Sequence, residues 1–213
     1  MREKGLILCS GGNPVDRQFS RALQWGKRKG DGNMELFMKE KVFSLHDIYH
    51  IYDMEGNEAY QIKSKAISIT NQTSLLDMEG NELAHIHRKV VSMHETHFIE
   101  IDGKEVTEVR TKLFHPIHQE IDAPEIGWQI RGNLWDHDFS VVDSGENVRA
   151  TVHRKWISIG EGYQITIASE EDMVLVLALI VALERILTDR KNESMSASTT
   201  SASSGGNAPG GNS

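Results

Sequence analysis

Cysteine is almost absent from the sequence, which contains only Cys9. A single cysteine cannot form an intramolecular disulfide, and disulfides are typical of proteins in oxidising compartments. Three apolar residues precede Cys9, whereas the apolar stretch of a secretion signal has about 7 to 15. We therefore expect a protein of the reducing cytoplasm that is neither secreted nor lipidated.

Catalytic motifs are also lacking. The sequence has no Walker A loop, no GxSxG nucleophile elbow and no HExxH zinc motif. Cys9 lies in a segment without helix or strand periodicity, which makes it a poor nucleophile candidate. Asp136 and Asp138 would share one face of a strand, but turn residues explain them equally well. We expect a protein that is not an enzyme and that uses no cofactor.

No hydrophobic run is long enough to cross a bilayer. The longest apolar run, residues 173–183, has 11 residues. As a helix it would be about 16 Å long, whereas a bilayer core requires roughly 20 residues. We therefore expect no transmembrane segment.

The same run is predicted to be a buried helix. Ser169 followed by three acidic residues is typical of a helix start, and we predict a helix over residues 170–190. Because the run has no polar face, it must be surrounded on every side, which a curved β-sheet can do. A tail anchor or an oligomerisation helix is the alternative.

Repeated hairpin signals before the helix predict this enclosing sheet. Residues 53–58 (DMEGNE) recur identically at 77–82, and residues 101–105 are a looser copy. Each copy places an Asp, Glu, Gly and Asn cluster between strand-like segments, as in a β-hairpin. The series predicts a mainly β fold, a closed antiparallel β-barrel enclosing the C-terminal helix. Four large aromatic residues are expected in the core or at the barrel ends: Trp128, Trp135, Phe139 and Trp156.

The two ends of the chain differ from this patterned region. Residues 1–33 show no periodicity and are predicted to be a disordered extension, with Met34 a candidate for the native start. Residues 193–213 are rich in Ser and Gly and cannot repay the entropy of ordering, so we predict a disordered tail. The barrel domain is expected over residues 34–192. That domain has a net charge of −11, which argues against a nucleic-acid partner.

Four segments resemble the LURP-one-related proteins, a branch of the tubby-like superfamily that includes the phospholipid scramblases. They are residues 37–44 (FMKEKVFS), 52–58 (YDMEGNE), 153–156 (HRKW) and 163–165 (YQI), the last of which leads into the final helix. The resemblance covers about residues 34–192. It implies a barrel of successive hairpins around one hydrophobic C-terminal helix.

The resemblance also implies possible activities. Tubby proteins bind phosphoinositides through basic barrel residues and scramblases act at membranes, but no defined lipid-binding motif of either matches this sequence. The LURP-one-related branch implies a cytosolic protein of undefined biochemical role that is linked in plants to defence. We expect a non-enzymatic binding or scaffold protein whose partner is a phospholipid headgroup, peripheral at the membrane. The alternatives are a soluble protein-interaction barrel in stress or regulatory physiology, and a scramblase-like membrane-associated protein. The sequence predicts no oligomeric state.

Recurring basic positions are the candidate binding residues. Placed at equivalent points of successive hairpins, they would lie on one rim of a barrel and concentrate positive potential there. The alternative is that they solvate strand edges and pair with the abundant acidic residues. The positions are Lys65, Arg88, Lys89, Lys112, Arg154 and Lys155.

Ten histidines raise the question of a metal site. His85 and His87 would share a strand face and could ligate together. No cysteine or tight carboxylate set accompanies them or the pairs His94/His97 and His115/His118. Exposed histidines on strand faces explain the pattern better, and we expect no metal site.

Overall fold

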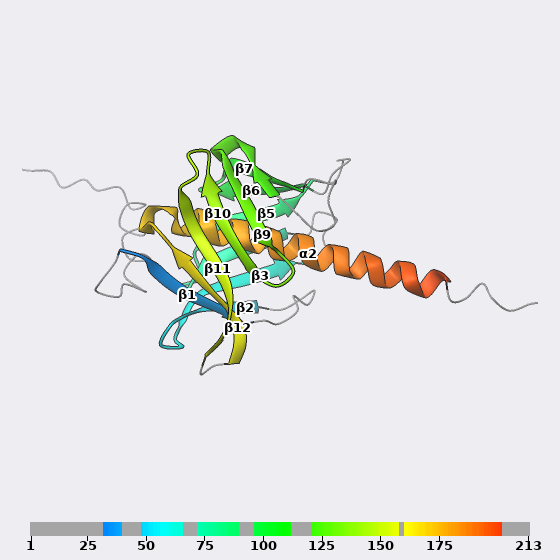
Figure 1. The fold of residues 1–213 in the computed structure, drawn as a ribbon, viewed down its shortest axis with the longest axis horizontal. Helices are drawn as coiled ribbons and strands as arrows, with labels where there is room; N and C mark the ends of the chain where they lie inside the picture. Colours follow the sequence, from blue (N-terminus) through cyan, green and yellow to red (C-terminus); the bar gives the residue numbers. More distant parts are fainter. Residues whose placement is uncertain are drawn as a thin grey trace, which may run out of the picture.

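The computed structural model describes residues 32–39, 48–65, 72–89, 96–111, 121–157 and 160–201. Within these residues, twelve strands form one closed antiparallel barrel around a helix (Figure 1). The strands are β1 (Met34–Lys39), β2 (Ile48–Asp53), β3 (Glu58–Lys65), β4 (Gln72–Asp77), β5 (Glu82–Arg88), β6 (Thr96–Ile101), β7 (Lys104–Thr111), β8 (Ile121–Ala123), β9 (Trp128–Asn133), β10 (Asp138–Asp143), β11 (Val148–Ile157) and β12 (Gly160–Ile167). Two short 3-10 helices, η1 (Pro124–Ile126) and η2 (Glu170–Asp172), precede β9 and the helix α2 (Met173–Ser201). The predicted mainly β barrel with an enclosed helix is confirmed.

The barrel has two chemically different ends because its strands alternate in direction. Each strand pairs with its neighbours in sequence, and β1 closes on β12, with Met34 opposite Ile167 and Lys39 opposite Gly162. One end, here called the turn end, carries the β2–β3, β4–β5, β6–β7 and β10–β11 turns and the start of α2. At the other end, here called the exit end, β3, β5, β7 and β11 finish and α2 leaves the barrel.

The repeated sequence folds as a repeated turn. Asp53 accepts hydrogen bonds from the backbone N–H and the side-chain amide of Asn57, at 2.8 and 2.9 Å, and Asp77 accepts the same pair from Asn81. A glycine with positive φ, 91° at Gly56 and 87° at Gly80, precedes each asparagine. A third copy spans residues 143–147 (DSGEN), in which a glutamate occupies the glycine position with φ 61°. The Asp and Asn residues are therefore common to all three turns, whereas the glycine is not required for the turn conformation.

We expect Gly80→Ala to destabilise the protein by about 1–2 kcal/mol through backbone conformation alone. No atom lies within 4 Å of the position that an added Cβ would occupy, so the substitution causes no clash. Urea unfolding would measure the change in the free energy of unfolding. Gly80→Asn is the matched control and should cost less, because asparagine tolerates positive φ. Equal losses for the two variants would contradict this explanation.

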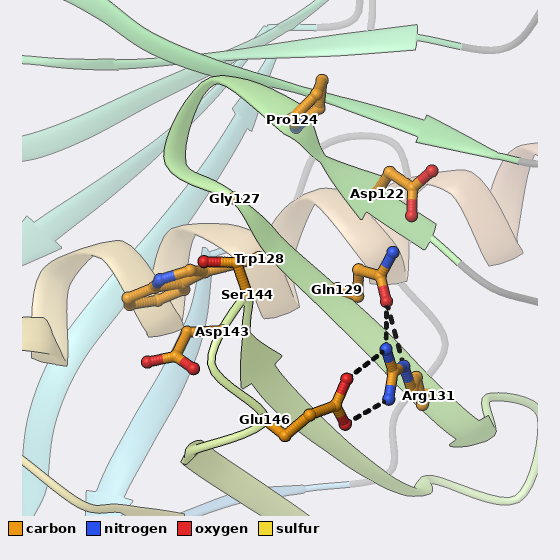
Figure 2. Close-up of a pocket in the computed structure, with 9 residues that line it drawn as sticks. All are labelled: Asp122, Pro124, Gly127, Trp128, Gln129, Arg131, Asp143, Ser144 and Glu146. Atoms are coloured by element: carbon orange, nitrogen blue, oxygen red, sulfur yellow. Dashed lines mark hydrogen bonds and ion pairs between the residues drawn. The ribbon is translucent and has the colours of Figure 1, made fainter.

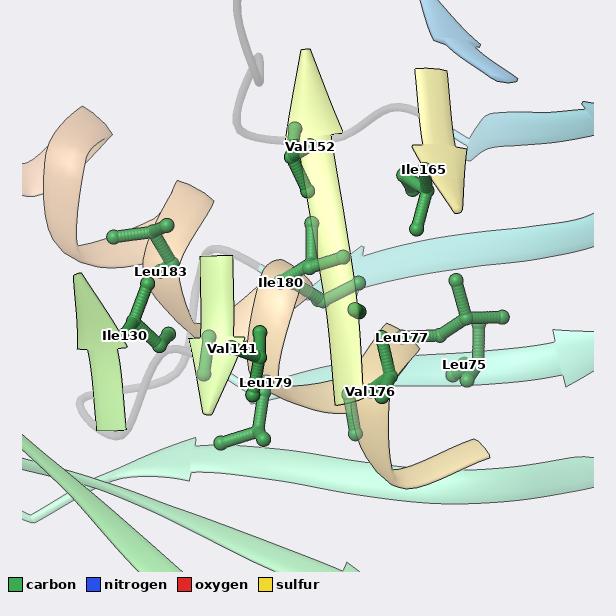
Figure 3. Close-up of a cluster of buried hydrophobic side chains, with 14 of the residues drawn as sticks. Leu75, Ile130, Val141, Val152, Ile165, Val176, Leu177, Leu179, Ile180 and Leu183 are labelled. Carbon is green, nitrogen blue, oxygen red and sulfur yellow. The ribbon is translucent and has the colours of Figure 1, made fainter. Parts of the chain in front are cut away.

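The apolar part of α2 lies inside the barrel and forms the centre of the core (Figure 3). Leu177 and Ile180 are 1% and 0% exposed, and side chains from the surrounding strands contact them from different directions. Full burial of a side chain of this size contributes about 1.5–3 kcal/mol. The strand residues drawn around the helix are Leu75, Ile130, Val141, Val152 and Ile165. The enclosed helix, and not the tail anchor, is therefore observed.

The helix boundaries differ from the prediction at both ends. Residues 170–172 form the 3-10 turn η2, and the side chain of Ser169 makes no capping hydrogen bond. At the other end α2 continues to Ser201, past the predicted end at 190 and into the predicted tail 193–213. Residues 192–201 contain neither Gly nor Pro, so helical hydrogen bonding can continue. Residues 1–31 and 202–213 lie outside the described residues.

Two of the four aromatic residues predicted for the interior or the barrel ends do not fill the core. Trp128 and Phe139 are buried as predicted, whereas Trp135 is 48% and Trp156 is 75% exposed. Trp135 follows the buried Leu134 in the β9–β10 connection, where Leu134 occupies the core position. Trp156 has the same strand parity as the buried Val152, but β11 extends beyond the barrel wall at that point. Among the helices of the described residues, none combines the length and the apolar character that a membrane span requires.

Candidate functional site

The described candidate basic residues all lie at the exit end. Lys65 and Arg88 are the last residues of β3 and β5, Lys89 follows Arg88, and Arg154 and Lys155 lie near the end of β11. They do not form one cluster, because β4 separates β3 from β5, while β12, β1 and β2 lie between β11 and β3. Lys112 lies outside the described residues. The repeat spacing therefore places these side chains around one rim of the barrel.

Three of these cations have a polar neighbour in the barrel wall, and the Nζ atom of Lys155 donates a hydrogen bond to Oε1 of Gln164. The Nζ atom of Lys89 lies 3.7 Å from a carboxylate oxygen of Glu108 and 5.0 Å from the ring centroid of Phe98. The Nε atom of Arg154 lies 4.0 Å from a carboxylate oxygen of Glu161. These cationic side chains are more than 40% exposed, and exposed ion pairs contribute about 0–1 kcal/mol. An incoming anion could replace such partners at small cost.

Acidic residues are concentrated at the opposite end. The turns there contain Asp53, Glu55, Asp77, Glu79, Asp143 and Glu146, and the start of the helix adds Glu170, Glu171 and Asp172. The net negative charge of the domain is therefore not spread evenly. The described exit end carries the candidate basic rim together with fewer acidic residues, Asp136, Asp138 and Glu161.

A projecting two-stranded ribbon carries Trp156 at the exit end. Beyond Val152, β11 has no partner residue in β10 and pairs only with β12, as far as Ile157 opposite Gly160. The ends of β11 and β12 protrude from the rest of the barrel in Figure 1. Trp156 directly follows Arg154 and Lys155 in this ribbon. The sequence signal for this surface is the HRKW segment that carried the family resemblance.

The exit end also exposes other large apolar side chains. Ile48 at the start of β2 is 53% exposed, and Trp135 between β9 and β10 is 48% exposed. In the strand order, Ile48 on β2 neighbours Lys65 on β3, and Trp135 lies between β9 and β10, beside the strand that carries Trp156. Basic residues together with exposed tryptophans can contact both the charged and the apolar layers of a membrane surface.

A pocket of about 390 Å³ lies at the turn end, between the β8–β9 connection and the β10–β11 turn (Figure 2). Arg131 pairs with Glu146 at 2.7 Å, and Arg149 pairs with Asp143 at 2.7 Å and with Asp172 at 3.1 Å. Hydrogen bonds from Asn147 and Arg149 hold the pKa of the Asp143 carboxyl well below its usual range. Three of the charged residues that line this pocket, Arg131, Asp143 and Glu146, are therefore held in ion pairs, as in a structural network.

The histidine pair considered for metal binding lies on the outer surface of the sheet. The ring centroids of His85 and His87 are 5.8 Å apart. Each ring faces a different carboxylate, Glu82 at 3.3 Å from His85 and Glu100 at 3.7 Å from His87. Among the described residues, no group of three or more His, Cys, Asp or Glu side chains could hold a metal ion.

A buried polar group lies where α2 approaches the exit end. The Glu184 carboxylate is 2.8 Å from Nε2 of His137 and accepts a hydrogen bond from the Tyr163 hydroxyl at 3.0 Å. The rings of His137 and Tyr163 stack with centroids 4.4 Å apart. These contacts attach the helix to the barrel wall and satisfy a carboxylate that follows directly on the apolar run.

Comparisons with known proteins agree on the fold and the family. Residues 34–184 match the family model described as LURP-one-related. The Bacillus subtilis (strain 168) uncharacterized protein YxjI is 35% identical over 162 residues, which cover 76% of this chain and 99% of that protein. An X-ray structure of an Arabidopsis thaliana protein superposes with a TM-score of 0.54 and 14% sequence identity, covering 72% of this chain and 91% of that one.

Proposed function

The chain belongs to the LURP-one-related family, and on this basis we propose that it is a non-enzymatic protein whose exit end docks on anionic phospholipid headgroups at a membrane surface. The observation that carries the proposal is that basic residues and exposed tryptophans share one end of the barrel. The opposite end is acidic and would be repelled by the same surface. The barrel would therefore bind with its exit end facing the membrane and its turn end facing away from it.

The chemistry of the rim is suited to peripheral binding. A basic residue close to an anionic membrane surface contributes about 1 kcal/mol, and several of them act together. Tryptophan prefers the boundary between the headgroups and the acyl chains, where its ring is half apolar and half polar. Trp156 projects on the ribbon beside two cations, so it can reach this layer while Arg154 and Lys155 contact phosphates.

Vesicle flotation with the full chain would test this proposal. We expect the protein to float with phosphoinositide-containing vesicles at low salt, and binding to weaken as salt screens the charges. Lys155→Gln should lower the affinity about fivefold, which corresponds to about 1 kcal/mol, and Trp156→Ala should lower it by a similar factor or more. Both side chains are exposed, so neither change should affect folding.

Matched controls are available at the turn end. Lys104→Gln removes the same charge from the β6–β7 turn, and Met78→Ala removes an apolar side chain that is 42% exposed. Neither should change flotation. Failure of the unmodified protein to float at low salt would refute the lipid proposal, as would equal losses in the exit-end and turn-end variants.

A second candidate function is binding of a protein partner, and the ribbon favours it. Residues 154–157 of β11 have one strand edge without a partner in β10. Exposed strand edges can accept an additional strand from another chain. A reproducible partner recovered with the wild-type chain but not with a Lys155→Pro variant, together with no flotation, would favour this function over lipid docking.

A further inference from the structure

Arg185 is the largest fully buried side chain among the described residues, at 1% exposure. It lies on α2, in the part of the helix that approaches the exit end. Its Nε, Nη1 and Nη2 atoms are buried, and in the described part of the chain none of them has a hydrogen-bond partner. A guanidinium group carries five N–H donors and stays protonated in proteins. A full positive charge with unused donors is therefore enclosed in the barrel.

His97 is a second buried group without partners near this charge. The residue lies on β6, is 0% exposed, and neither ring nitrogen has a hydrogen-bond partner among the described residues. Burial, with smaller effects from the charges of Arg88, Arg185 and His87, lowers the pKa of His97 to about 3. The ring is therefore neutral at pH 7 and offers one N–H donor. His97 lies on β6, one of the strands against which α2 packs, and Arg185 lies on α2, so the two groups belong to the same layer of the core.

Carboxylates of the helix do not satisfy Arg185. Glu184 is the adjacent residue, but its carboxylate contacts His137 and Tyr163. Asp189 lies one turn further along the helix and makes no hydrogen bond to the guanidinium. Buried charges in proteins are normally paired, because the loss of hydration must be compensated. Since arginine cannot lose its proton, a bound anion would supply the compensation that the described carboxylates of the helix do not.

We infer that Arg185 and His97 form an internal anion site at the exit end of the barrel, which binds a small oxyanion of the phosphate or carboxylate type. The planar fork of the guanidinium matches two oxygens of such an ion, and the neutral His97 ring can donate a third hydrogen bond. The enclosed position favours a free ion over a headgroup attached to a bilayer. The inference does not depend on lipid docking, which uses the outer residues of the rim.

Inorganic phosphate is a suitable probe for this site. Equilibrium dialysis of the full chain should show one bound phosphate per chain. Thermal unfolding should shift upwards in phosphate relative to chloride at equal ionic strength, by about 5–10 °C at one hundred times the dissociation constant. The absence of both bound phosphate and a thermal shift would overturn the inference.

Arg185→Met tests the site directly, and Arg190→Met is its control, because Arg190 is a half-buried arginine of the same helix. Arg185→Met should lose phosphate binding and the thermal shift, and in phosphate-free buffer it should be at least as stable as the unmodified chain. Arg190→Met should keep both properties. Arg185→Lys keeps the charge but loses the fork, and should bind phosphate at least about tenfold more weakly.

Other outcomes also decide the question. A strongly destabilised Arg185→Met variant, with no phosphate effect in the unmodified protein, would show that the chain itself neutralises Arg185 and would overturn the inference. Loss of vesicle flotation in Arg185→Lys without any binding of free phosphate would identify the headgroup as the source of the anion, and would also overturn it. Phosphate binding that is retained in both Arg185 variants would place the ion elsewhere and would contradict the assignment to Arg185.

Discussion

Leu177→Lys and Ile180→Lys are each expected to abolish cooperative folding of the barrel. Both side chains are completely buried in the centre of the core, at 1% and 0% exposure, and are surrounded by apolar side chains. A lysine there would place an ammonium group where no acceptor is available, at a cost of more than about 5 kcal/mol. This loss is comparable to the total stability of many domains. Circular dichroism and urea unfolding would show the loss of the transition.

Leu175→Lys is the control for this pair. Leu175 lies on the same helix but is only partly buried, so a lysine there can extend its ammonium group towards solvent. We expect a folded protein with reduced stability. If the Leu177 and Ile180 variants stay folded and merely become more soluble, the helix is not enclosed in solution and the architecture is refuted.

Gly162→Ala is expected to lower the free energy of unfolding by at least about 3 kcal/mol. Gly162 lies on β12 opposite Lys39 of β1, at the seam that closes the barrel. A Cβ atom there would lie 2.2 Å from the Met38 carbonyl oxygen and 2.8 Å from Cα of Lys39. Both atoms belong to the backbone, so the clash can be relieved only by moving β1 away from β12. Urea unfolding would measure the loss, and hydrogen exchange should show faster exchange in β1.

Gly145→Ala provides the comparison. The nearest atoms to its added Cβ would be side-chain atoms, Nδ2 of Asn147 at 3.0 Å and Oδ1 of Asp143 at 3.3 Å. These side chains would have to move by only a few tenths of an ångström in an exposed turn, so the cost should stay below about 1 kcal/mol. Similar losses for both glycine variants would show that the seam between β1 and β12 tolerates separation.

The fold was predictable because both of its signals are local in the sequence: one is a repeated turn and the other is a single apolar segment. The DMEGNE turns mark hairpins, and the uniformly apolar 173–183 segment requires enclosure. The third turn is harder to recognise, because Glu146 stands where the first two copies have glycine. The end of the helix was not predictable in this way, because a Ser-rich composition is typical of disorder, although residues 192–201 contain no Gly or Pro to interrupt the helix.

The candidate site was predictable only in part. Similar spacing from the turn glycines, nine residues to Lys65 and to Lys89 and ten to Lys155, placed these lysines at one end, because alternating strands bring equivalent positions to the same rim. The exposure of the aromatic side chains at this end was not predictable from the spacing. Trp156 has the strand parity of a core residue. Only the pairing pattern shows that β11 extends beyond the end of its neighbour β10, which leaves Trp156 outside the barrel wall. The burial of Arg185 depends on how far the barrel wall extends along α2, which no local pattern encodes.

The position of α2 at the centre of the barrel has a consequence for biosynthesis. The ribosome makes the twelve strands before the helix, yet the helix provides the apolar surface on which the inner faces of those strands pack. While Leu177 and Ile180 remain in the exit tunnel, the emerged strands have no core to close upon. The strands can pair as sequential hairpins, but their inner apolar faces stay uncovered until the helix emerges, which leaves those faces open to aggregation. We therefore expect barrel closure to follow translation of the helix.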